Sequence, residues 1–277
     1  MRLEIDGLSF DYSSKDVLRD VGFEARHGEV LGILGENGCG KTTLLKCINK
    51  LLKQKSGCVC LSDMREGILD PKTEQKYSRE GTVSTDDMTN KEIARSMAVV
   101  KQSEYISFPF TALEAVKMGR YASNSSNTSE QELEIVYGAM KDAGALEFAD
   151  RCVNELSGGE LRRVMIARAL AQEADILLLD EPTLHLDVCH QFDLMELVKM
   201  LARERDLMVI MVTHDITFAG RYCDRLIMME HGRIVHAGAT EDVLTVENVR
   251  EIFHIDADIV RDDRVDGLLV TMIGRTA

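Results

Sequence analysis

One segment constrains the fold of this chain more than any other: residues 35–43, which read Gly-Glu-Asn-Gly-Cys-Gly-Lys-Thr-Thr and match G-x-x-x-x-G-K-T. The apolar run 30–34 comes directly before it. A buried strand must therefore turn sharply into a helix. The glycines let consecutive backbone N–H groups point inward, where with the helix N-terminus they form an anion cradle. This context favours a nucleotide-phosphate site over a glycine-rich turn with a chance lysine.

The side chains of this loop have separate expected roles. Lys41 is expected to reach the β- and γ-phosphates, and the Thr42 hydroxyl is expected to coordinate Mg²⁺. Alkylation of the Cys39 thiol, inside the loop, is expected to obstruct nucleotide binding. The remaining nucleotide contacts are expected from the loop itself, at Gly35, Asn37, Gly38, Gly40 and Thr43.

Composition restricts the class of protein. The chain has 277 residues, 45% hydrophobic and 29% charged, which is enough to bury a large core in one sizeable domain. Its formal net charge of -14 argues against general affinity for nucleic acid or anionic lipid, because both need a basic face. No apolar run approaches the ~20 residues needed to cross a bilayer, and residues 1–6 lack a signal-peptide pattern. We therefore expect any membrane role to come through a partner.

The seven cysteines are scattered and odd in number, which suggests reduced, cytoplasmic thiols rather than a disulfide framework. Cys58 and Cys60 are two residues apart, so strand alternation would put both thiols on one face. This pair is a weak hint of a metal site, because no second pair follows at zinc-site spacing. Small core residues are the favoured interpretation.

The first part of the chain predicts a mixture of strands and one helix. Residues 3–30 alternate apolar and polar positions, which predicts a short antiparallel β region. The loop helix is expected over 41–52, and a strand over 57–61. The polar stretch 62–90 is interpreted as a solvated loop or an extended hairpin, with a binding element as the alternative. Residues 98–100 are apolar again and are expected to be buried in the core.

The middle of the chain is helical in pattern. Between 106 and about 156 a Ser/Asn-rich break at 123–129 separates two helical parts, of which 130–148 is apolar-periodic. This pattern predicts an inserted helical lobe.

The remainder returns to a β-α-β rhythm. Continuous apolar runs at 176–179 and 208–212 are typical of parallel strands covered by helices on both faces, and a helix is expected around 189–205 between them. The tail is expected to contain a helix near 247–253 and a hairpin whose turn includes Asp266-Gly267.

A second group of polar residues narrows the chemistry. Asp180 and Glu181 follow the apolar run 176–179, at the end of a strand expected beside the phosphate loop. The Asp180 carboxylate can hold Mg²⁺ directly or through water, and Glu181 can polarise the water that attacks the γ-phosphate. The phosphate loop alone leaves kinases, GTPases and transport ATPases open. The paired acids favour hydrolysis.

The segment 156–163, Leu-Ser-Gly-Gly-Glu-Leu-Arg-Arg, is a second anion site, because Ser157, Gly158 and Gly159 precede an apolar-periodic helix. One chain cannot easily place both sites on one phosphate. The segment resembles the signature motif of ATP-binding cassette (ABC) ATPases. Glu160 stands where glutamine is more usual, but Ser157 and both glycines are intact, so activity is expected to be retained.

This resemblance implies ATP and Mg²⁺ as ligands and a head-to-tail dimer of two copies. In such a dimer, the Ser157-Gly158-Gly159-Glu160 end of one chain caps the ATP that the phosphate loop of the other chain holds. Gln102 resembles the glutamine that meets Mg²⁺ and the attacking water, and His214 resembles the switch histidine that contacts the γ-phosphate. Asp187 resembles the aspartate of the loop that crosses the dimer interface.

Two further assignments compete with packing roles. Tyr12 is placed like the aromatic residue that stacks on adenine, and a packing role is its alternative. His185, Cys189 and His190 have the residue types of a metal site. Their place beside Asp187 instead favours packing at the dimer interface or exposure to solvent.

By the same resemblance, residues 1–277 form a single ABC ATPase domain of the α/β class, a P-loop NTPase with a mixed sheet. We assign 1–105 and 157–240 to a RecA-like core with an N-terminal antiparallel β region. The helical lobe is assigned to 106–156, with the signature motif at its end, and the C-terminal tail to 241–277.

The segment 102–120 resembles the ATPases of iron-siderophore, heme and cobalamin importers, although its aromatic residues could instead pack inside the lobe. The resemblance implies a membrane permease as partner at the cytoplasmic face of the membrane, and a separate solute-binding protein that delivers the cargo. The alternative is a soluble ABC ATPase of a protein assembly, such as iron–sulfur cluster assembly. A DNA-repair member is disfavoured by the acidic charge and the lack of a long heptad segment, so no nucleic-acid partner is expected.

Overall fold

The structure, a computed structural model, describes residues 1–13, 15–65, 67–70, 72–74, 81–102, 108–122 and 127–276. Six strands of this part form the central sheet, in the order β10-β9-β3-β8-β7-β6. Their bounds are β3 Val30–Gly35, β6 Met97–Val100, β7 Ile176–Asp180, β8 Met208–Val212, β9 Arg225–Glu230 and β10 Arg233–Ala239. β10 runs antiparallel to β9, and the other neighbouring strands are parallel. The predicted mixed sheet is confirmed.

Side chains on the two faces of this sheet enter two separate cores. On β3, Val30 and Leu34 enter one core, whereas Leu31 and Ile33 enter the other. Helices cover the first face: α6 Gly158–Ala171, α7 Val188–Glu204 and α8 Ile216–Tyr222. The prediction of helices on both faces is confirmed, although the second face is covered by a second sheet as well as by a helix. There α1, Lys41–Ile48, shares the core with a second sheet, because that sheet also needs an apolar surface to cover its inner side.

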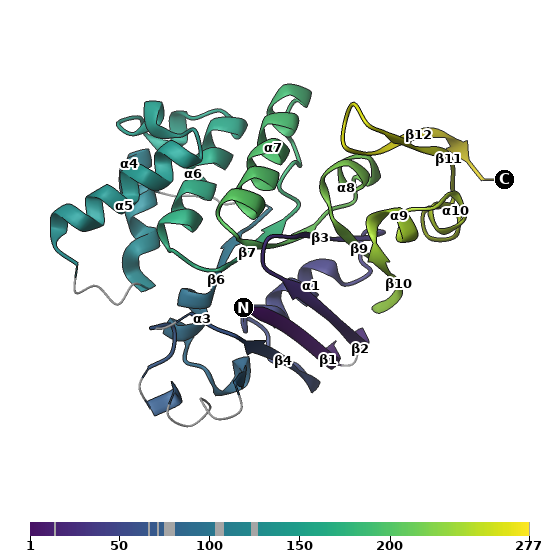
Figure 1. The fold of residues 1–277 in the computed structure, drawn as a ribbon, viewed down its shortest axis with the longest axis horizontal. Coiled ribbons are helices and arrows are strands. Elements are labelled where there is room, and N and C mark those ends of the chain that lie inside the picture. The colour runs from purple at the N-terminus through teal and green to yellow at the C-terminus, as the bar shows by residue number, and fades with distance from the viewer. Residues whose placement is uncertain are drawn as a thin grey trace.

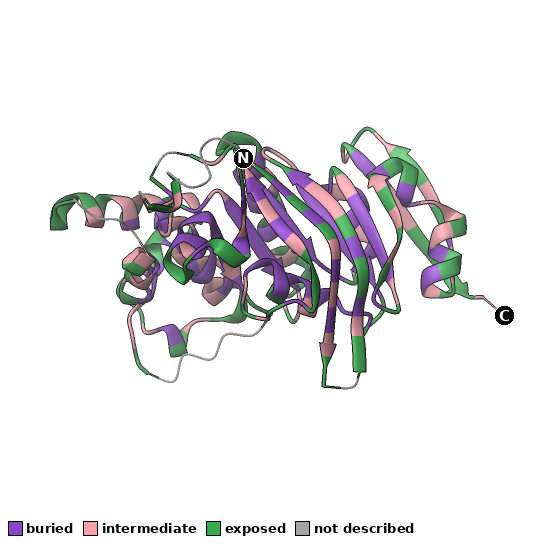
Figure 2. Ribbon diagram, turned by 90° about the horizontal axis from the view of Figure 1, so that it is seen from below, coloured by how far each residue is buried: buried purple, intermediate pink, exposed green. Residues whose placement is uncertain are grey.

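This second sheet confirms the predicted antiparallel β region. Its order is β2-β1-β4-β5, with bounds β1 Arg2–Tyr12, β2 Lys15–Arg26, β4 Ser56–Ser62 and β5 Thr82–Ser84. Leu3, Ile5 and Leu8 of β1 are buried, while the residues between them face outward. Figure 2 shows this alternation of buried and exposed positions along the strands.

The stretch 62–90 contributes to the core where the structure describes it. β5 pairs with β4, a short 3₁₀ turn covers Thr85–Asp87, and α3 spans Asn90–Ser96. Ile68, Val83 and Met88 are buried. The hairpin interpretation therefore holds for these residues and the solvated-loop interpretation does not. Residues 66, 71 and 75–80 lie outside the described part.

Cys58 and Cys60 do share one face of β4, as predicted, and their sulfur atoms are 3.4 Å apart. The core interpretation was wrong, because both side chains are only half-buried and lie on the outer face of the sheet. Glu4 and Asp6 of β1 are their cross-strand neighbours.

Two predicted helices end earlier than expected. α1 ends at Ile48 rather than residue 52, since Lys50 adopts a left-handed conformation with φ of 59°. In the lobe, α5 spans Ser129–Asp142, and Gly144, with φ of 62°, separates it from a 3₁₀ turn at Leu146–Phe148. Apolar periodicity continues across both ends, so it did not reveal either stop.

The helical lobe is confirmed as a group of short helices packed on α6. It contains α4 Ala112–Lys117, α5, and 3₁₀ turns at Met118–Ala122 and Val153–Glu155. Thr111, Thr128 and Ser157 cap α4, α5 and α6, each in a capping box with the residue three positions later. Residues 103–107, which follow Gln102, and 123–126 of the predicted break lie outside the described residues.

The C-terminal tail forms a separate layer on α8. α9 spans Thr240–Val243, α10 Val246–Phe253, β11 Ile255–Asp262 and β12 Gly267–Arg275. The predicted helix and hairpin are confirmed, but the turn covers 263–266 and Gly267 already pairs with Asp262. The lobe and this tail lie at opposite ends of the molecule (Figure 1).

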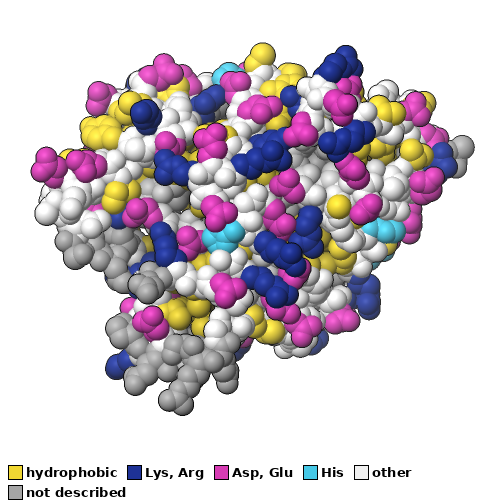
Figure 3. All heavy atoms as spheres, in the orientation of Figure 1, with side chains coloured by type: hydrophobic (Ala, Val, Ile, Leu, Met, Phe, Trp, Pro, Cys, Tyr) yellow, Lys and Arg dark blue, Asp and Glu magenta, His cyan; other side chains and the backbone are white. Residues whose placement is uncertain are grey.

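Two properties of the described residues concern possible contacts with a membrane or a partner: the charge distribution on the surface, and the length and apolar character of the helices. On the face shown in Figure 3, acidic and basic side chains are interspersed. Within the described ranges, no helix combines the length and apolar character that a bilayer-spanning segment requires.

Candidate functional site

The phosphate loop connects the C-terminal end of β3 to the first residue of α1. Gly38 and Gly40 have φ values of 85° and 111°, a left-handed region that favours glycine. A Cβ on Gly40 would lie 2.9 Å from Cδ2 of Leu18, and one on Gly35 only 2.3 Å from the carbonyl oxygen of Met229. The glycines at these positions are therefore required by conformation and by close packing.

Two loop side chains are held by specific hydrogen bonds. Lys41 is buried, and its Nζ donates to the carbonyl oxygens of Gly35, at 2.6 Å, and Glu36, at 3.1 Å. The Thr42 hydroxyl donates to Oδ1 of Asp180 at 3.0 Å. Burial raises the pKa of the Asp180 carboxyl, and the Thr42 hydrogen bond opposes that shift. The two expected magnesium ligands are thus brought together from positions 138 residues apart.

Glu181 and His214 meet beside this pair. Glu181 is buried, and its backbone N–H donates to the carbonyl oxygen of Val212 at the end of β8. Oε2 of Glu181 lies 2.7 Å from Nδ1 of His214, whose side chain is 48% exposed. An acid that is held by a half-exposed imidazole is positioned to orient a water molecule.

A pocket of about 220 Å³ brings the phosphate loop together with Gln102 and Glu181. Asp180 and His214 do not line it, but each contacts a residue that does, Thr42 and Glu181 respectively. It is lined by Val17, Asn37, Gly38, Gly40, Lys41, Thr42, Thr43, Gln102 and Glu181. A hydroxyl, carboxylates and an amide are the oxygen donors that Mg²⁺ prefers, and the glycine cradle with Lys41 suits phosphate. The residues present therefore fit a magnesium nucleotide. Cys39 is buried and is not among the residues that line this pocket, and burial raises the pKa of its thiol.

The signature residues lie outside the lining of this pocket. Ser157 caps α6: its Oγ accepts from the backbone N–H of Glu160, and Oε2 of Glu160 accepts from that of Ser157. Oε1 of Glu160 also accepts from Arg151 at 2.8 Å. These hydrogen bonds lower the pKa of the Glu160 carboxyl. Ser157 and Gly158 are exposed, and Gly159 is buried against its own chain.

Asp187 and Tyr12 occupy the ends of a helix and a strand. Asp187 caps α7 and accepts from the backbone of His190 at 3.0 Å. The exposed Tyr12 ends β1 and contacts Phe10 edge-to-face, with ring centroids 4.8 Å apart. In the described ranges, no group of three or more His, Cys, Asp or Glu side chains could hold a metal ion, the cluster at 185–190 included.

Sequence reasoning missed two residues at this site. Val17 lines the phosphate pocket, and the buried Arg162 donates to the backbone carbonyls of Lys101 and Gln102 at 2.6 and 2.8 Å. Arg162 thereby ties the signature helix to Gln102. An arginine on the apolar side of a periodic helix was the available signal, because a buried guanidinium needs acceptors.

Comparison with known proteins agrees with this geometry. The family model of the ABC transporter matches residues 18–184, more than half of the chain. The chain belongs to the ABC transporter family. As an ABC transporter ATPase it binds and hydrolyses ATP, and the fold inferred from the sequence is confirmed.

Several curated ABC relatives align along most of this chain. The ferric enterobactin transport ATP-binding protein FepC of Escherichia coli is 35% identical over 100% of this chain and 96% of its own length. The uncharacterized ABC transporter ATP-binding protein MJ0089 of Methanocaldococcus jannaschii is 37% identical, with 94% of both chains covered. The cobalamin import ATP-binding protein BtuD of Halobacterium salinarum is 36% identical over 98% of this chain, which spans 63% of that longer relative.

Solved ABC structures share the fold. CbiO1 from Clostridium perfringens, part of the ABC transporter complex cbiONQ, has a TM-score of 0.72 and 30% identity, covering 90% of this chain and 92% of its own. The ATP-binding cassette MJ0796, a dimer in a post-hydrolysis state bound to ADP and Pi, has a TM-score of 0.69 and 27% identity, covering 86% and 98%.

Proposed function

We propose that this ABC ATPase is the ATP-hydrolysing subunit of an importer, in which two copies close head to tail around two ATP and drive a membrane permease. The observation that carries the proposal is the pocket in which Lys41, Thr42, Gln102 and Glu181 converge. The residues that line this pocket are typical of a hydrolase rather than of a module that only binds nucleotide. Glu181 contacts His214 and is proposed to lie where a water molecule could attack the γ-phosphate.

In the proposed reaction, each side chain has one task. Lys41 and the loop backbone bind the phosphates, and His214 contacts the γ-phosphate. Thr42, Asp180 and Gln102 would hold Mg²⁺, which would supply positive charge to the phosphate oxygens. Glu181 orients and polarises the attacking water, and Gln102 assists it. Tyr12, whose ring is exposed at the end of β1, is proposed to stack on the adenine.

The position of the signature turn supports the proposed dimer. Ser157 and Gly158 are exposed at the N-terminus of a 14-residue helix, outside the pocket that holds the phosphate loop. A second copy, turned head to tail, would place its Ser157, Gly158, Gly159 and Glu160 over the ATP of the first. Asp187 is proposed to lie at the same interface.

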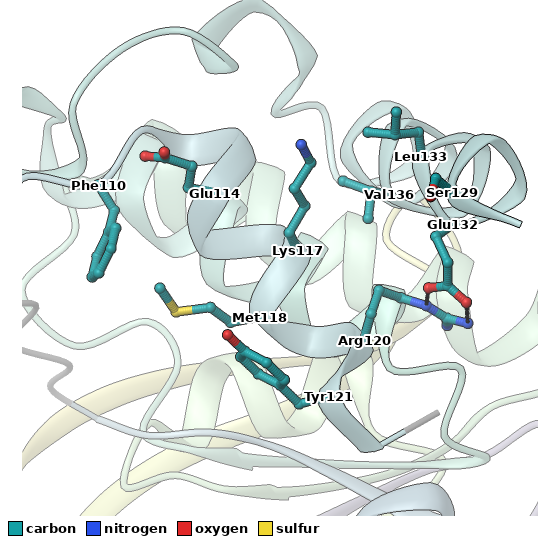
Figure 4. Close-up of a pocket in the computed structure, with 10 residues that line it drawn as sticks. All are labelled: Phe110, Glu114, Lys117, Met118, Arg120, Tyr121, Ser129, Glu132, Leu133 and Val136. Atoms are coloured by element: carbon teal, nitrogen blue, oxygen red, sulfur yellow. Dashed lines mark hydrogen bonds and ion pairs between the residues drawn. The ribbon is translucent and has the colours of Figure 1, made fainter. Parts of the chain in front are cut away.

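The permease is proposed to contact the lobe at a pocket of about 610 Å³ (Figure 4). Phe110, Met118 and Tyr121 project into it from one side, and α5 supplies Leu133 and Val136. An ion pair between Arg120 and Glu132, at 2.5 Å, borders it. Tyr121 is 86% exposed, which is unusual for a large aromatic side chain and typical of an interaction surface.

The proposed cargo class is iron-siderophore, heme or cobalamin, with a solute-binding protein as an indirect partner and the cytoplasmic face of the membrane as the site of action. The support is that similar proteins are named for import of ferric enterobactin, iron(3+)-hydroxamate and cobalamin. No residue of the ATPase is expected to contact the cargo itself. A soluble ABC ATPase of a protein assembly stays the alternative.

The test is dimerisation with Mg-ATP, followed by light scattering, in the native chain and in Glu181→Gln. The variant should form an ATP-dependent dimer while hydrolysis collapses, because nucleotide binding is kept and water activation is lost. Glu181→Gln combined with Lys41→Ala is the control that should stay monomeric. A Glu181→Gln chain that stays monomeric at saturating ATP would contradict the head-to-tail proposal.

The transport part of the proposal has its own test. Co-purification with a membrane permease is expected, and Tyr121→Ala should weaken it while ATP-dependent dimerisation is kept. A stable complex with a soluble assembly partner instead would favour the alternative function.

A further inference from the structure

The imidazole of His190 lies directly on the signature turn of its own chain. A Cβ built on Gly159 would be 2.4 Å from Cδ2 and 2.8 Å from Cγ of this ring. Gly159 is in the first turn of α6 and has no positive φ, so a side chain there would meet no backbone strain but would collide with the His190 ring as it now lies. Next to it, a Cβ on Gly158 would be 3.6 Å from Cδ2 of Leu186.

Asp187 holds the same ring from the other side. Its Oδ2 lies 2.7 Å from Nδ1 of His190, and its Oδ1 accepts from the His190 backbone at 3.0 Å. The carboxylate therefore caps α7 and fixes the imidazole at once. Of the ring atoms, Nε2 also faces the signature turn, 3.1 Å from the Cβ position of Gly159.

The segment that carries this contact starts at the catalytic acid. The backbone of Leu184 donates to the carbonyl of Glu181, and that of Leu186 donates to the carbonyl of Thr183. The side chain of Gln191, next to His190, donates to Thr183 at 3.2 Å. Hydrogen bonds thus continue from Glu181 to the first turn of α7.

A second contact joins the helices themselves. Arg163 of α6 donates to Asp193 of α7 at 3.0 Å, and the two helices lie next to each other in Figure 1. Arg163 and Asp193 pair at the surface, where an ion pair contributes little to position. The His190 ring is the tighter of the two connections, because it leaves no space at Gly159.

We propose that His190 is a positioning residue, which sets the place of the Gly158-Gly159 turn from the segment that follows Glu181. This inference rests on the proposed head-to-tail dimer. In that dimer the turn acts on the ATP held by the partner, while Glu181 acts on the ATP held by its own chain. His190 would therefore connect the two ATP sites through one chain.

The first test compares His190→Ala with His190→Gln and with Glu204→Ala, a change at the exposed last residue of the same helix. His190→Ala should lower kcat by ~100-fold, because a small displacement of a group that contacts the reacting phosphate is costly. Affinity of the monomer for ATP should not change, since the phosphate loop is untouched. His190→Gln, which can still donate to Asp187, should recover part of kcat, and Glu204→Ala should behave as the native chain.

The decisive test uses mixed dimers with one active site. One copy carries Glu181→Gln, so the only hydrolysing site belongs to the other copy and is capped by the signature turn of the Glu181→Gln copy. His190→Ala placed in the Glu181→Gln copy should abolish most of the remaining activity. The same change placed in the other copy should have little effect, because that turn caps the inactive site.

Equal activity of the two mixed dimers would overturn the role of His190, whether both lose activity or both keep it. A general defect in folding would lower both equally, so it cannot imitate the expected difference. If no mixed dimer forms with Mg-ATP although each copy binds ATP, the head-to-tail proposal itself fails, and the inference with it.

Discussion

Oε2 of Glu181 lies 2.7 Å from Nδ1 of His214, although the two residues are 33 positions apart in the chain. They meet because β7 and β8 are parallel neighbours, so the residues that follow the two strands emerge at the same edge of the sheet. The imidazole contacts a carboxylate that lines the phosphate pocket. The orientation of Glu181 therefore depends on His214.

Replacing His214 should slow hydrolysis without removing nucleotide binding. His214→Ala is expected to lower kcat by ~100-fold, because Glu181 loses the group that orients it and the γ-phosphate loses a donor. Phosphate release and fluorescent-nucleotide binding measure the two effects. His236→Ala, in β10 and paired with Glu251, is the control and should leave both unchanged. A native kcat in His214→Ala would argue against this role.

Removing the hydroxyl of Thr42 should lower the apparent affinity of the ATPase for Mg²⁺. We expect Thr42→Val to raise the Mg²⁺ concentration for half-maximal activity by about tenfold or more, because a metal ligand and the hydrogen bond to Asp180 are lost together. A magnesium titration of ATPase activity at fixed ATP measures this. Thr42→Ser keeps the hydroxyl and should restore most of the affinity. Similar curves for the valine and serine variants would contradict the assignment.

Activity should fall on acidification at a higher pH than an ordinary aspartate would predict. Burial raises the pKa of Asp180, so this carboxyl takes up its proton earlier as the pH falls, and the protonated form is a poor magnesium ligand. The Thr42 hydrogen bond lowers this pKa. In Thr42→Val the acid limb of the pH–rate profile should therefore move to higher pH, whereas an unmoved limb would exclude Asp180 as its cause.

A side chain at Gly40 should destabilise the loop. Gly40→Ala is expected to cost about 1–2 kcal/mol, because φ of 111° is strained for alanine and the new Cβ would press on Leu18. Gly138 in α5 is the matched control: apart from its chain neighbours and the backbone of its own helix, no atom lies within 4 Å of its Cβ position, so Gly138→Ala should stabilise by up to ~1 kcal/mol. Urea unfolding compares the two. If both variants changed the free energy of unfolding by the same amount and in the same direction, the local strain at Gly40 would be refuted.

Glu160→Gln should be well tolerated. Glutamine can accept the Ser157 N–H as glutamate does, so the capping box is kept and only the ion pair with Arg151 is lost. ATPase activity should stay within about twofold of the native value, because an exposed ion pair contributes little. Glu160→Ala removes the cap acceptor and should lower the melting temperature further. Loss of activity in the glutamine variant would indicate that Glu160 contacts nucleotide as a carboxylate.

The elements with strong local patterns were predictable. Strands β3, β7 and β8 were found because they are buried on both faces, which makes them continuous apolar runs. β10 was missed, since it is an edge strand whose residues alternate between exposed and half-buried. The end of α1 was misplaced, because the left-handed turn at Lys50 has no glycine to mark it.

The amino-acid sequence by itself determined the chemistry available to this protein. Lys41, Thr42, Asp180 and Glu181 could be named because their roles depend on local context, a loop after a strand or acids at a strand end. The tertiary structure decided which of them meet. Thr42 reaches Asp180, Arg162 reaches Gln102, and His190 reaches Gly159. These contacts depend on the order of strands in the sheet and on how α6 and α7 pack against it. The strand order and the helix packing are set by the burial of apolar surface along the whole chain, so no short segment specifies them.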